Sequence, residues 1–435
     1  MSSAGHTPRP SQRRRVRRAG KARVYRRRRL FALIAVAVVV AILGGVLWAA
    51  VGGSGADAPP ASGSSSASAS GSGSGSGEKG GESGEAEPRP SPSPTAWTGP
   101  PSSSLKLKLR ETIVSPDIAP KSVVSTGTGY IFAQNMMYKH TMTVYDAKTL
   151  ELVETISDEI DADTFRIKGH GETIQGAPVE AAAMPDGRFM YVSQYSMFGE
   201  GFTEGQDVCA PGDGTDRSYV YRIPLDTLAV DKVIRVGAVP KYVTVTPDQK
   251  YLLVSNWCSY SLSVIDIHTS KVVESVYLGP YPRGIAVSPD SQTAYVAVMG
   301  SYDIAEVDLR DFSVSWIRGV GSSPRHLCMA PNGKYLYATL NGEGTVAKID
   351  PETRTVVDKV ATGAQPRSMA IAPDGKSLFV VNYDSSTMSM VRTSDMKVID
   401  TVNTDSLPIG ITYDAPTKSV WLCCYSGSIM VFKQV

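Results

Sequence analysis

Histidine and cysteine are scarce, with five of each among 435 residues. The histidines lie far apart and show no metal-ligand spacing; they are His6, His140, His170, His268 and His326. This pattern argues against a histidine-rich metal centre, and we expect no metal and no other cofactor. No Ser/His/Asp triad or glycine-rich phosphate loop stands out either.

Acidic residues are absent from positions 1–29, which hold 12 Lys and Arg residues. Long apolar runs are rare, and the exception is Leu30–Val51, 22 residues without a charge. This run is long enough to span a bilayer, and basic residues flank only its N-terminal side, which predicts a cytoplasmic N-terminus and an exported remainder. A cleaved signal peptide is the alternative, since Ala56-Asp57-Ala58 resembles a cleavage site. The length of the run favours an uncleaved anchor.

Large apolar residues are nearly absent from residues 52–104, which are mostly Gly, Ser, Ala and Pro. Such a segment cannot bury enough surface to fold, so we expect a disordered linker. The chain then divides into a basic cytoplasmic tail (1–29), a transmembrane helix (30–51), the linker and a folded domain (105–435). The folded domain is net acidic, and we expect it to bind no nucleic acid.

A 42-residue repeat organises the folded domain. Prolines recur at this spacing at Pro240, Pro282, Pro324, Pro366 and Pro408. Each unit contains short β-rich runs separated by turns, and a period of this size carrying four strands is typical of a propeller blade. Degraded copies begin at Pro120 and Pro178, which brings the number of units to seven.

The two ends of the repeat array complement each other. The last unit, from Pro408, contains only three strand-like runs, whereas Leu105–Val114 is an alternating strand without a unit of its own. We predict that this strand completes the last blade and closes the ring, because closure removes exposed sheet edges. The predicted fold is therefore an all-β, seven-bladed propeller over residues 105–435.

Several units share a strand that follows a Pro-Asp-Gly-like turn. Examples are Tyr191-Val192-Ser193-Gln194, Leu253-Val254-Ser255-Asn256 and Phe379-Val380-Val381-Asn382. These segments resemble YVTN-type β-propeller repeats, and the resemblance covers about residues 105–435. Other units depart from the pattern, with Val298, Leu340 and Cys424 at the position of the terminal Asn. The resemblance implies the fold but no single activity, because such repeats occur in proteins with different functions.

The loops of a propeller lie on two faces. Both long insertions, Ser157–Ala177 and Tyr195–Ser218, fall in connections of one face, which we call the insertion face. Variable loops on a rigid scaffold commonly bind ligands, so we expect function on this face. The Pro-Asp-Gly-like turns lie on the opposite, turn face and are interpreted as structural.

A basic residue follows the unit proline in five of the seven units: Lys121, Lys241, Arg283, Arg325 and Arg367. The repeat places these residues on one circle at the channel mouth of the insertion face, where they would attract anions. Two alternatives remain open. Each cation pairs with a local partner, or acidic residues of the insertions, among them Asp158 and Asp207, fold over the ring and neutralise it.

The unit that begins at Pro324 contains residues that could catalyse a reaction. Its segment Pro324-Arg325-His326-Leu327 is similar to a segment of the seven-bladed lactonase family, whose Arg and His lie at the channel mouth with a Glu. The resemblance implies anion binding by Arg325, general-base catalysis by His326 and a role for Glu343. Glu343 comes one residue later than the family pattern requires, after Asn341 and Gly342. A lactonase-like hydrolase is thus the alternative to a non-catalytic role.

Two cysteines fall on neighbouring units of the insertion face. Cys209 lies in the long insertion of the second unit, and Cys258 lies in the equivalent loop of the third. Because an exported domain can be oxidised, we predict a Cys209–Cys258 disulfide. We expect Cys328, Cys423 and Cys424 to be free thiols of the core.

These patterns together predict a membrane-anchored, extracytoplasmic propeller. We expect it to act as a non-catalytic binding or scaffold module of the cell envelope, with an anionic ligand, an envelope polymer or a protein as its partner. The candidate ligand-binding residues are Lys121, Lys241, Arg283, Arg325, His326 and Arg367.

Overall fold

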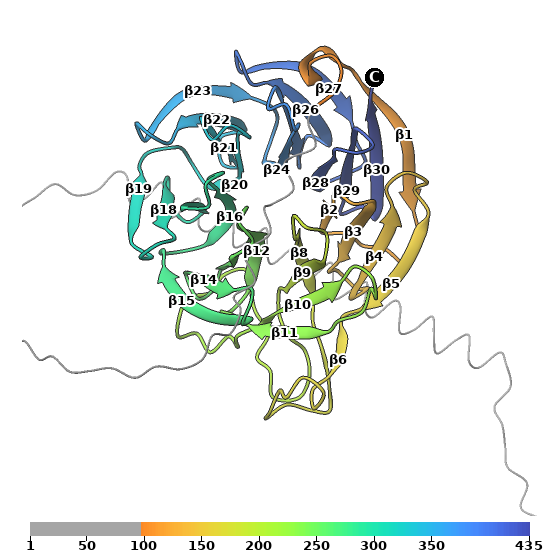
Figure 1. The fold of residues 1–435 in the computed structure, drawn as a ribbon, viewed down its shortest axis with the longest axis vertical. Helices are drawn as coiled ribbons and strands as arrows, with labels where there is room; N and C mark the ends of the chain where they lie inside the picture. The colour runs from red at the N-terminus through yellow and green to blue at the C-terminus, as the bar shows by residue number, and fades with distance from the viewer. Residues whose placement is uncertain (1–96) are drawn as a thin grey trace, which may run out of the picture. The chain divides into compact units, whose positions relative to one another are not determined.

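A computed structural model describes residues 97–435, which form seven four-stranded antiparallel sheets arranged in a ring (Figure 1). This arrangement confirms the predicted all-β, seven-bladed propeller. In the described range no helix has the length and apolar character needed to cross a bilayer. The predicted membrane helix, residues 30–51, lies outside the described residues.

Blades 1 to 6 each use four strands in chain order, from the inner strand to the outer one. Blades 1 to 3 contain β2 (Ser122–Ser125), β3 (Tyr130–Asn135), β4 (Thr141–Asp146), β5 (Leu152–Ser157); β8 (Pro178–Ala183), β9 (Phe189–Gln194), β10 (Tyr219–Pro224), β11 (Lys232–Arg235); β12 (Pro240–Val245), β13 (Tyr251–Asn256), β14 (Ser261–Asp266) and β15 (Lys271–Tyr277). Blades 4 to 6 contain β16 (Pro282–Val287), β17 (Thr293–Val298), β18 (Ile304–Asp308), β19 (Val314–Ile317); β20 (Pro324–Met329), β21 (Leu336–Leu340), β22 (Thr345–Asp350), β23 (Thr355–Ala361); β24 (Pro366–Ile371), β25 (Ser377–Asn382), β26 (Thr387–Arg392) and β27 (Lys397–Asn403).

The seventh blade is built from both ends of the folded domain. Its three inner strands are β28 (Pro408–Asp414), β29 (Ser419–Cys424) and β30 (Ser428–Gln434), and its outer strand is β1 (Leu107–Val114). β1 runs antiparallel to β30, with Leu107 opposite Gln434 and Val114 opposite Ser428. The N-terminal strand therefore closes the ring as predicted.

The ordered domain begins before the predicted boundary at Leu105. The 3-10 helix η1 (Ser102–Ser104) lies against blade 6, where the backbone N–H and the hydroxyl of Ser102 donate to the Asp374 carboxylate at 2.8 and 2.6 Å. Lys418 also donates to the carbonyl of Thr98 at 2.6 Å. These contacts are polar, and so a prediction based on apolar burial overlooked them.

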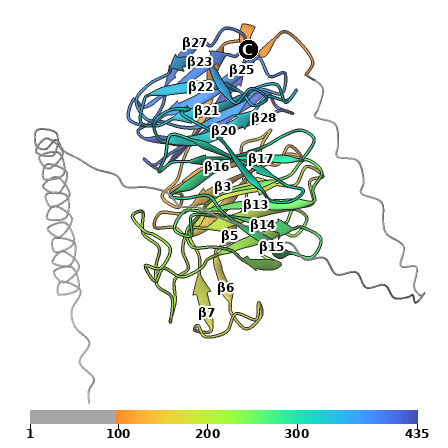
Figure 2. The same cartoon turned by 90° about the vertical axis from the view of Figure 1, so that its left-hand side faces the viewer.

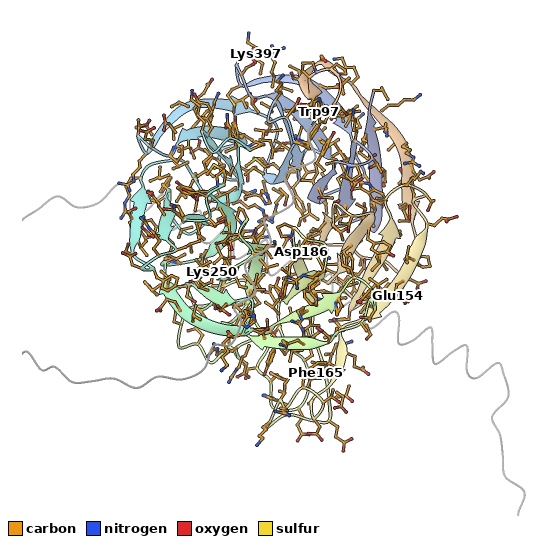
Figure 3. The ribbon with its side chains drawn as sticks, in the orientation of Figure 1. Trp97, Glu154, Phe165, Asp186, Lys250 and Lys397 are labelled. Atoms are coloured by element: carbon orange, nitrogen blue, oxygen red, sulfur yellow. A yellow bond between two sulfur atoms is a disulfide. The ribbon has the colours of Figure 1, made fainter. Side chains whose placement is uncertain are left out.

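Apolar side chains between neighbouring blades form the core. In one cluster, Leu253 and Val264 of blade 3 pack against Val296 and Val307 of blade 4, and all four are fully buried or nearly so. The outer strands instead carry exposed charged residues, such as Glu154 of β5, at the rim of the ring in Figure 3. The interfaces between blades therefore hold the ring rigid around its channel.

Candidate functional site

An irregularity at the start of the inner strand in blades 2 to 7 positions four of the five basic residues, all except Lys121. Ladder pairing slips immediately after the unit proline in blades 2 to 7, as between Pro282 and Ile285 or between Pro324 and Leu327. Such bulges re-aim side chains. The residue before the proline also has a positive φ in five blades, at Val239, Tyr281, Ser323, Gln365 and Leu407. This repeated geometry frees the residue after the proline from the sheet.

The two insertions pack against each other on the insertion face. The first contains a small hairpin, β6 (Glu159–Asp161) and β7 (Thr173–Gln175), which projects from the ring in Figure 2. Gln175 at its end pairs with Phe198 of the second insertion, and Ile174 shares an apolar cluster with Met197. The insertions therefore support one another.

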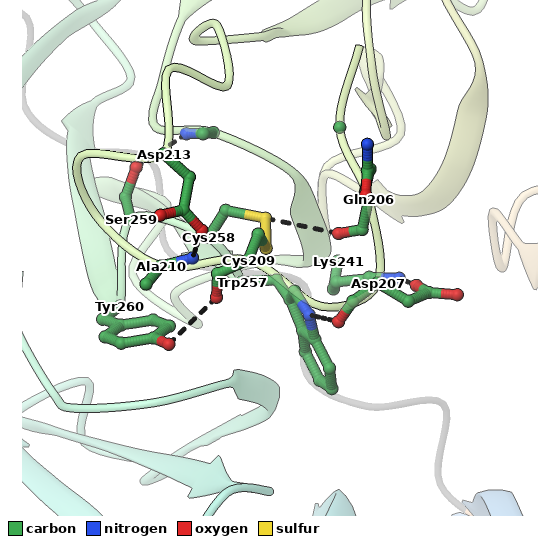
Figure 4. Close-up of a disulfide and its surroundings, with 12 residues drawn as sticks. Gln206, Asp207, Cys209, Ala210, Asp213, Lys241, Trp257, Cys258, Ser259 and Tyr260 are labelled. Atoms are coloured by element: carbon green, nitrogen blue, oxygen red, sulfur yellow. Dashed lines mark hydrogen bonds and ion pairs between the residues drawn. A yellow bond between two sulfur atoms is a disulfide. The ribbon is translucent and has the colours of Figure 1, made fainter. Parts of the chain in front are cut away.

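A disulfide fixes the second insertion to blade 3 (Figure 4). It joins Cys209 and Cys258, the pair expected from the sequence, with a Cα–Cα distance of 5.3 Å. The Tyr260 hydroxyl donates to the Cys209 carbonyl at 2.9 Å, and the Trp257 indole N–H donates to the Asp207 carbonyl at 2.9 Å. Asp207 is thereby held next to the channel.

Two of the five ring cations have carboxylate partners. Lys121 pairs with Glu180 at 3.1 Å, and Lys241 pairs with Asp207 at 2.7 Å. Asp158, the other insertion carboxylate considered above, is fully buried with its Oδ2 3.3 Å from His140 Nδ1. Burial raises the pKa of Asp158 to about 8, so at pH 7 it adds little negative charge. The insertions thus neutralise the ring only in part.

Arg283 and Arg325 differ from the lysines, because both are buried and neither is in ion-pair contact with a carboxylate of the described domain. Their exposed fractions are 6% and 5%, and neither guanidinium has a hydrogen-bond acceptor within residues 97–435. Arg283 only approaches the face of Trp257, at 5.9 Å from the ring centroid. Leaving a buried guanidinium unpaired is costly. Glu180 acts on both arginines through space but not through a hydrogen bond, so the pair forms a positive centre that is only partly compensated.

Arg367, the fifth cation, is partly satisfied. It donates to the Gln365 side chain at 2.9 Å and lies 4.0 Å from the centroid of the Tyr383 ring. Its Nε is buried and has no acceptor in the described part of the chain. This nitrogen is a further donor without a partner within residues 97–435, but it is not exposed to solvent.

The pKa shifts indicate that the charges of the ring cations act on one another. Burial lowers the pKa of Lys241 to about 7, with added repulsion from Arg283, and lowers that of Lys121 to about 8. Burial, followed by repulsion from Arg283 and Arg367, holds the pKa of Arg325 well below its usual value. An anion bound at this centre would relieve both burial and repulsion.

A cavity of about 710 Å³ opens beside this ring on the insertion face. Its walls include Lys121, Lys241 and Asp207, together with four tyrosines, Tyr138, Tyr195, Tyr383 and Tyr425. The size suits a small molecule or one unit of a polymer, and the tyrosines provide apolar faces and hydroxyl groups. The cavity reaches the ring at its two lysines, and Arg283, Arg325 and Arg367 are not among its lining residues.

His326 lies elsewhere, which corrects its predicted place at the mouth. It lines a separate cavity of about 440 Å³ on the turn side of the channel, with Tyr242 and Glu180. Its ring meets the Tyr242 ring edge-on, with centroids 5.3 Å apart. Burial, then repulsion from Arg325, lowers the pKa of His326 to about 3, so it is a weak base at neutral pH. Arg325 and His326 are consecutive in β20, but only His326 lines the cavity on the turn side of the channel.

Glu343 does not join the other catalytic candidates. Its carboxylate accepts hydrogen bonds from the Ser322 backbone N–H at 2.6 Å and from Lys359 at 3.1 Å. No contact within residues 97–435 joins it to Arg325 or His326, and it lines neither cavity. The lactonase-like set is therefore not assembled. The described residues also contain no cluster of three or more His, Cys, Asp or Glu suited to a metal.

The sequence prediction missed Glu180, the carboxylate that pairs with Lys121. It lies two residues after Pro178, in a degraded unit, whereas the repeat drew attention to the residue directly after each proline. The bulge between Pro178 and Glu180 places this later residue in the channel. A lone acid among apolar neighbours in an inner strand was the available signal.

Comparisons with known proteins support the propeller fold. The family model described as YNCE-like beta-propeller matches residues 206–332, well under half of the chain. A solved chain of hydrazine synthase from Kuenenia stuttgartiensis is similar with a TM-score of 0.59 and 19% identity, covering 74% of this chain and 97% of that chain. No curated protein matches. At this identity the likeness shows the fold alone.

Proposed function

We propose that this chain is a non-catalytic propeller that binds anionic groups at the channel mouth of the insertion face. The observation that carries the proposal is the buried pair Arg283 and Arg325, which has no acceptor within the described residues. An oxyanion offers the paired acceptors that guanidinium groups prefer. Arg367 Nε adds a third donor without a partner among those residues.

The cell envelope is the proposed location. The uncharged run Leu30–Val51 and the basic flank before it support a membrane anchor with the propeller outside. The Cys209–Cys258 disulfide is compatible with an oxidising compartment. An anchored module of this kind would bind an anionic polymer or protein of the envelope.

A hydrolytic role has less support. His326 is a weak base in a cavity that Arg325 does not line, and Glu343 is already bound by Ser322 and Lys359. Hydrolysis of a ring ester needs a base and an oxyanion-binding group close to the same atom.

Neutralising the two arginines tests the proposal. Isothermal titration of the wild type with sulfate at low ionic strength should give binding, and Arg283→Gln with Arg325→Gln should weaken it at least about tenfold. The double variant should also melt at the same or a higher temperature, because uncompensated buried charge is removed.

A matched control is Arg354→Gln, which changes an exposed arginine paired with Glu306. It should leave sulfate binding unchanged. Absence of sulfate binding to the wild type, or equal affinity of the wild type and the double variant, would contradict the proposal.

A further inference from the structure

We propose that Asp207 is a built-in competitor for the bound anion, so that it selects which anions the ring accepts. This inference rests on the proposed function, since it concerns the same site. It assigns the ligand to the class of compact oxyanions with two negative charges, such as sulfate, a phosphate monoester or a dicarboxylate.

Asp207 makes the contacts that a ligand oxyanion would make. Its Oδ1 lies 2.7 Å from Lys241 Nζ and accepts a hydrogen bond from the Tyr195 hydroxyl at 3.2 Å. The Lys241 ammonium also lies 4.3 Å from the centroid of the Tyr195 ring. One corner of the cationic ring is therefore already occupied by a carboxylate of the protein.

This carboxylate approaches from the solvent side. The Asp207 side chain is 78% exposed, whereas that of Lys241 is 9% exposed. Both residues line the cavity at the channel mouth. An anion that enters through this cavity therefore passes close to Asp207, and it either displaces this carboxylate or binds beside it against its repulsion.

The position of Asp207 is fixed by several contacts. The disulfide lies two residues further along at Cys209, and Trp257 holds the Asp207 carbonyl at 2.9 Å (Figure 4). The backbone of the segment therefore cannot swing away freely. The Asp207 side chain is exposed, but its fixed backbone keeps the carboxylate within reach of Lys241.

The remaining charges set the ligand class. Glu180 and Asp207 contact the two lysines and act on Arg283 only at longer range, so most of the uncompensated charge belongs to Arg283 and Arg325. A singly charged anion neutralises only one of them and still meets the repulsion of Asp207. We expect a compact dianion to neutralise both arginines, because each acts electrostatically on the other, and this gain to outweigh the repulsion from Asp207.

Removing the charge of Asp207 tests the inference in the full-length protein. Isothermal titration at pH 6, where Lys241 is protonated, should show sulfate binding to Asp207→Asn about tenfold more tightly than to the wild type. The preference for sulfate over acetate at equal ionic strength should shrink. Glu204→Gln removes a carboxylate from the same insertion without a ring contact and should behave as the wild type does.

A second variant controls for a change in the protonation of Lys241. Loss of Asp207 removes an interaction that raises the pKa of Lys241, so Asp207→Asn is also measured in a Lys241→Arg background, where the charge is permanent. Sulfate affinity should rise there as well.

The outcomes separate the two proposals. If the wild type binds sulfate but Asp207→Asn binds it no better in either background, the competitor role is wrong and the anion site stands. If the wild type and both Asp207→Asn variants all fail to bind sulfate, the proposed function itself is overturned.

Discussion

At the scale of single residues, burial rather than pairing determines the character of the ring. Lys121 and Lys241 have carboxylate partners, yet burial lowers the pKa of both toward neutrality. Burial also lowers the pKa of Arg283 and Arg325, which occupy equivalent positions in their blades, but arginine starts from a much higher pKa than lysine and holds its proton more strongly. The site therefore combines two permanent charges with two that respond to pH.

This combination predicts that anion affinity falls as pH rises from 6 to 9. The protonated lysines attract the anion; Lys241 loses its proton near pH 7 and Lys121 near pH 8. Each lost charge should weaken sulfate binding about three- to tenfold, as measured by titration at each pH. In the Lys241→Arg variant, sulfate affinity should no longer fall near pH 7, because arginine keeps its proton there. A constant affinity, or an equally steep fall in the variant, would contradict the assignment.

Residue-level prediction from the sequence succeeded where the repeat constrains geometry. The repeat grouped basic residues that act on one another electrostatically in the structure, and it placed Cys209 near Cys258, which form a disulfide. The repeat could not show that Arg325 and His326 point in different directions. A bulge changes the directions of adjacent side chains, and the spacing of the repeat does not reveal this change. The repeat also missed Glu180, which appears in only one blade.

At the scale of strands, two features matter most. The inner-strand bulges orient the basic side chains, and the strand β1 closes the ring. The bulges repeat with the prolines and direct one side chain per blade toward the channel. β1 covers the outer edge of blade 7, and its inward side chains Leu107 and Ile113 pack against the core. Without β1, β30 would present an unpaired edge.

Charges on the inner side of β1 should open this closure. Leu107→Asp with Ile113→Asp should lower the free energy of unfolding by about 2–5 kcal/mol, because both carboxylates would be driven into an apolar cluster. Denaturant unfolding followed by tryptophan fluorescence measures the change. The control Lys108→Asp with Val114→Asp alters exposed positions of the same strand and should stay within about 1 kcal/mol. Equal loss in both variants would count against a sealing role for β1.

At the scale of the whole molecule, the fold was predictable because it is a sum of similar units. Regular proline spacing revealed the five best blades, and the unmatched strand at one end with the missing strand at the other revealed the closure. The packing of residues 97–104 was not predictable in this way, since it depends on Ser102 meeting Asp374 in a distant blade. Tertiary polar contacts leave no periodic trace in the sequence.

The proposed orientation in the membrane also belongs to this scale. Alkaline phosphatase fused after Val435 should be active, because it needs an oxidising compartment, and a green fluorescent protein at the same place should be dark. Fusions after Arg29, before the apolar run, should give the opposite pattern. A fluorescent fusion after Val435 would show the proposed orientation to be wrong.

Closure of the ring by β1 also affects the timing of folding during synthesis. β1 is the first strand of the ring to leave the ribosome, but its partner β30 ends at Gln434. At 5–20 residues per second, β1 waits on the order of half a minute for this partner. Its exposed charges, Lys108, Arg110 and Glu111, would keep the waiting strand soluble and discourage pairing with a neighbouring nascent chain.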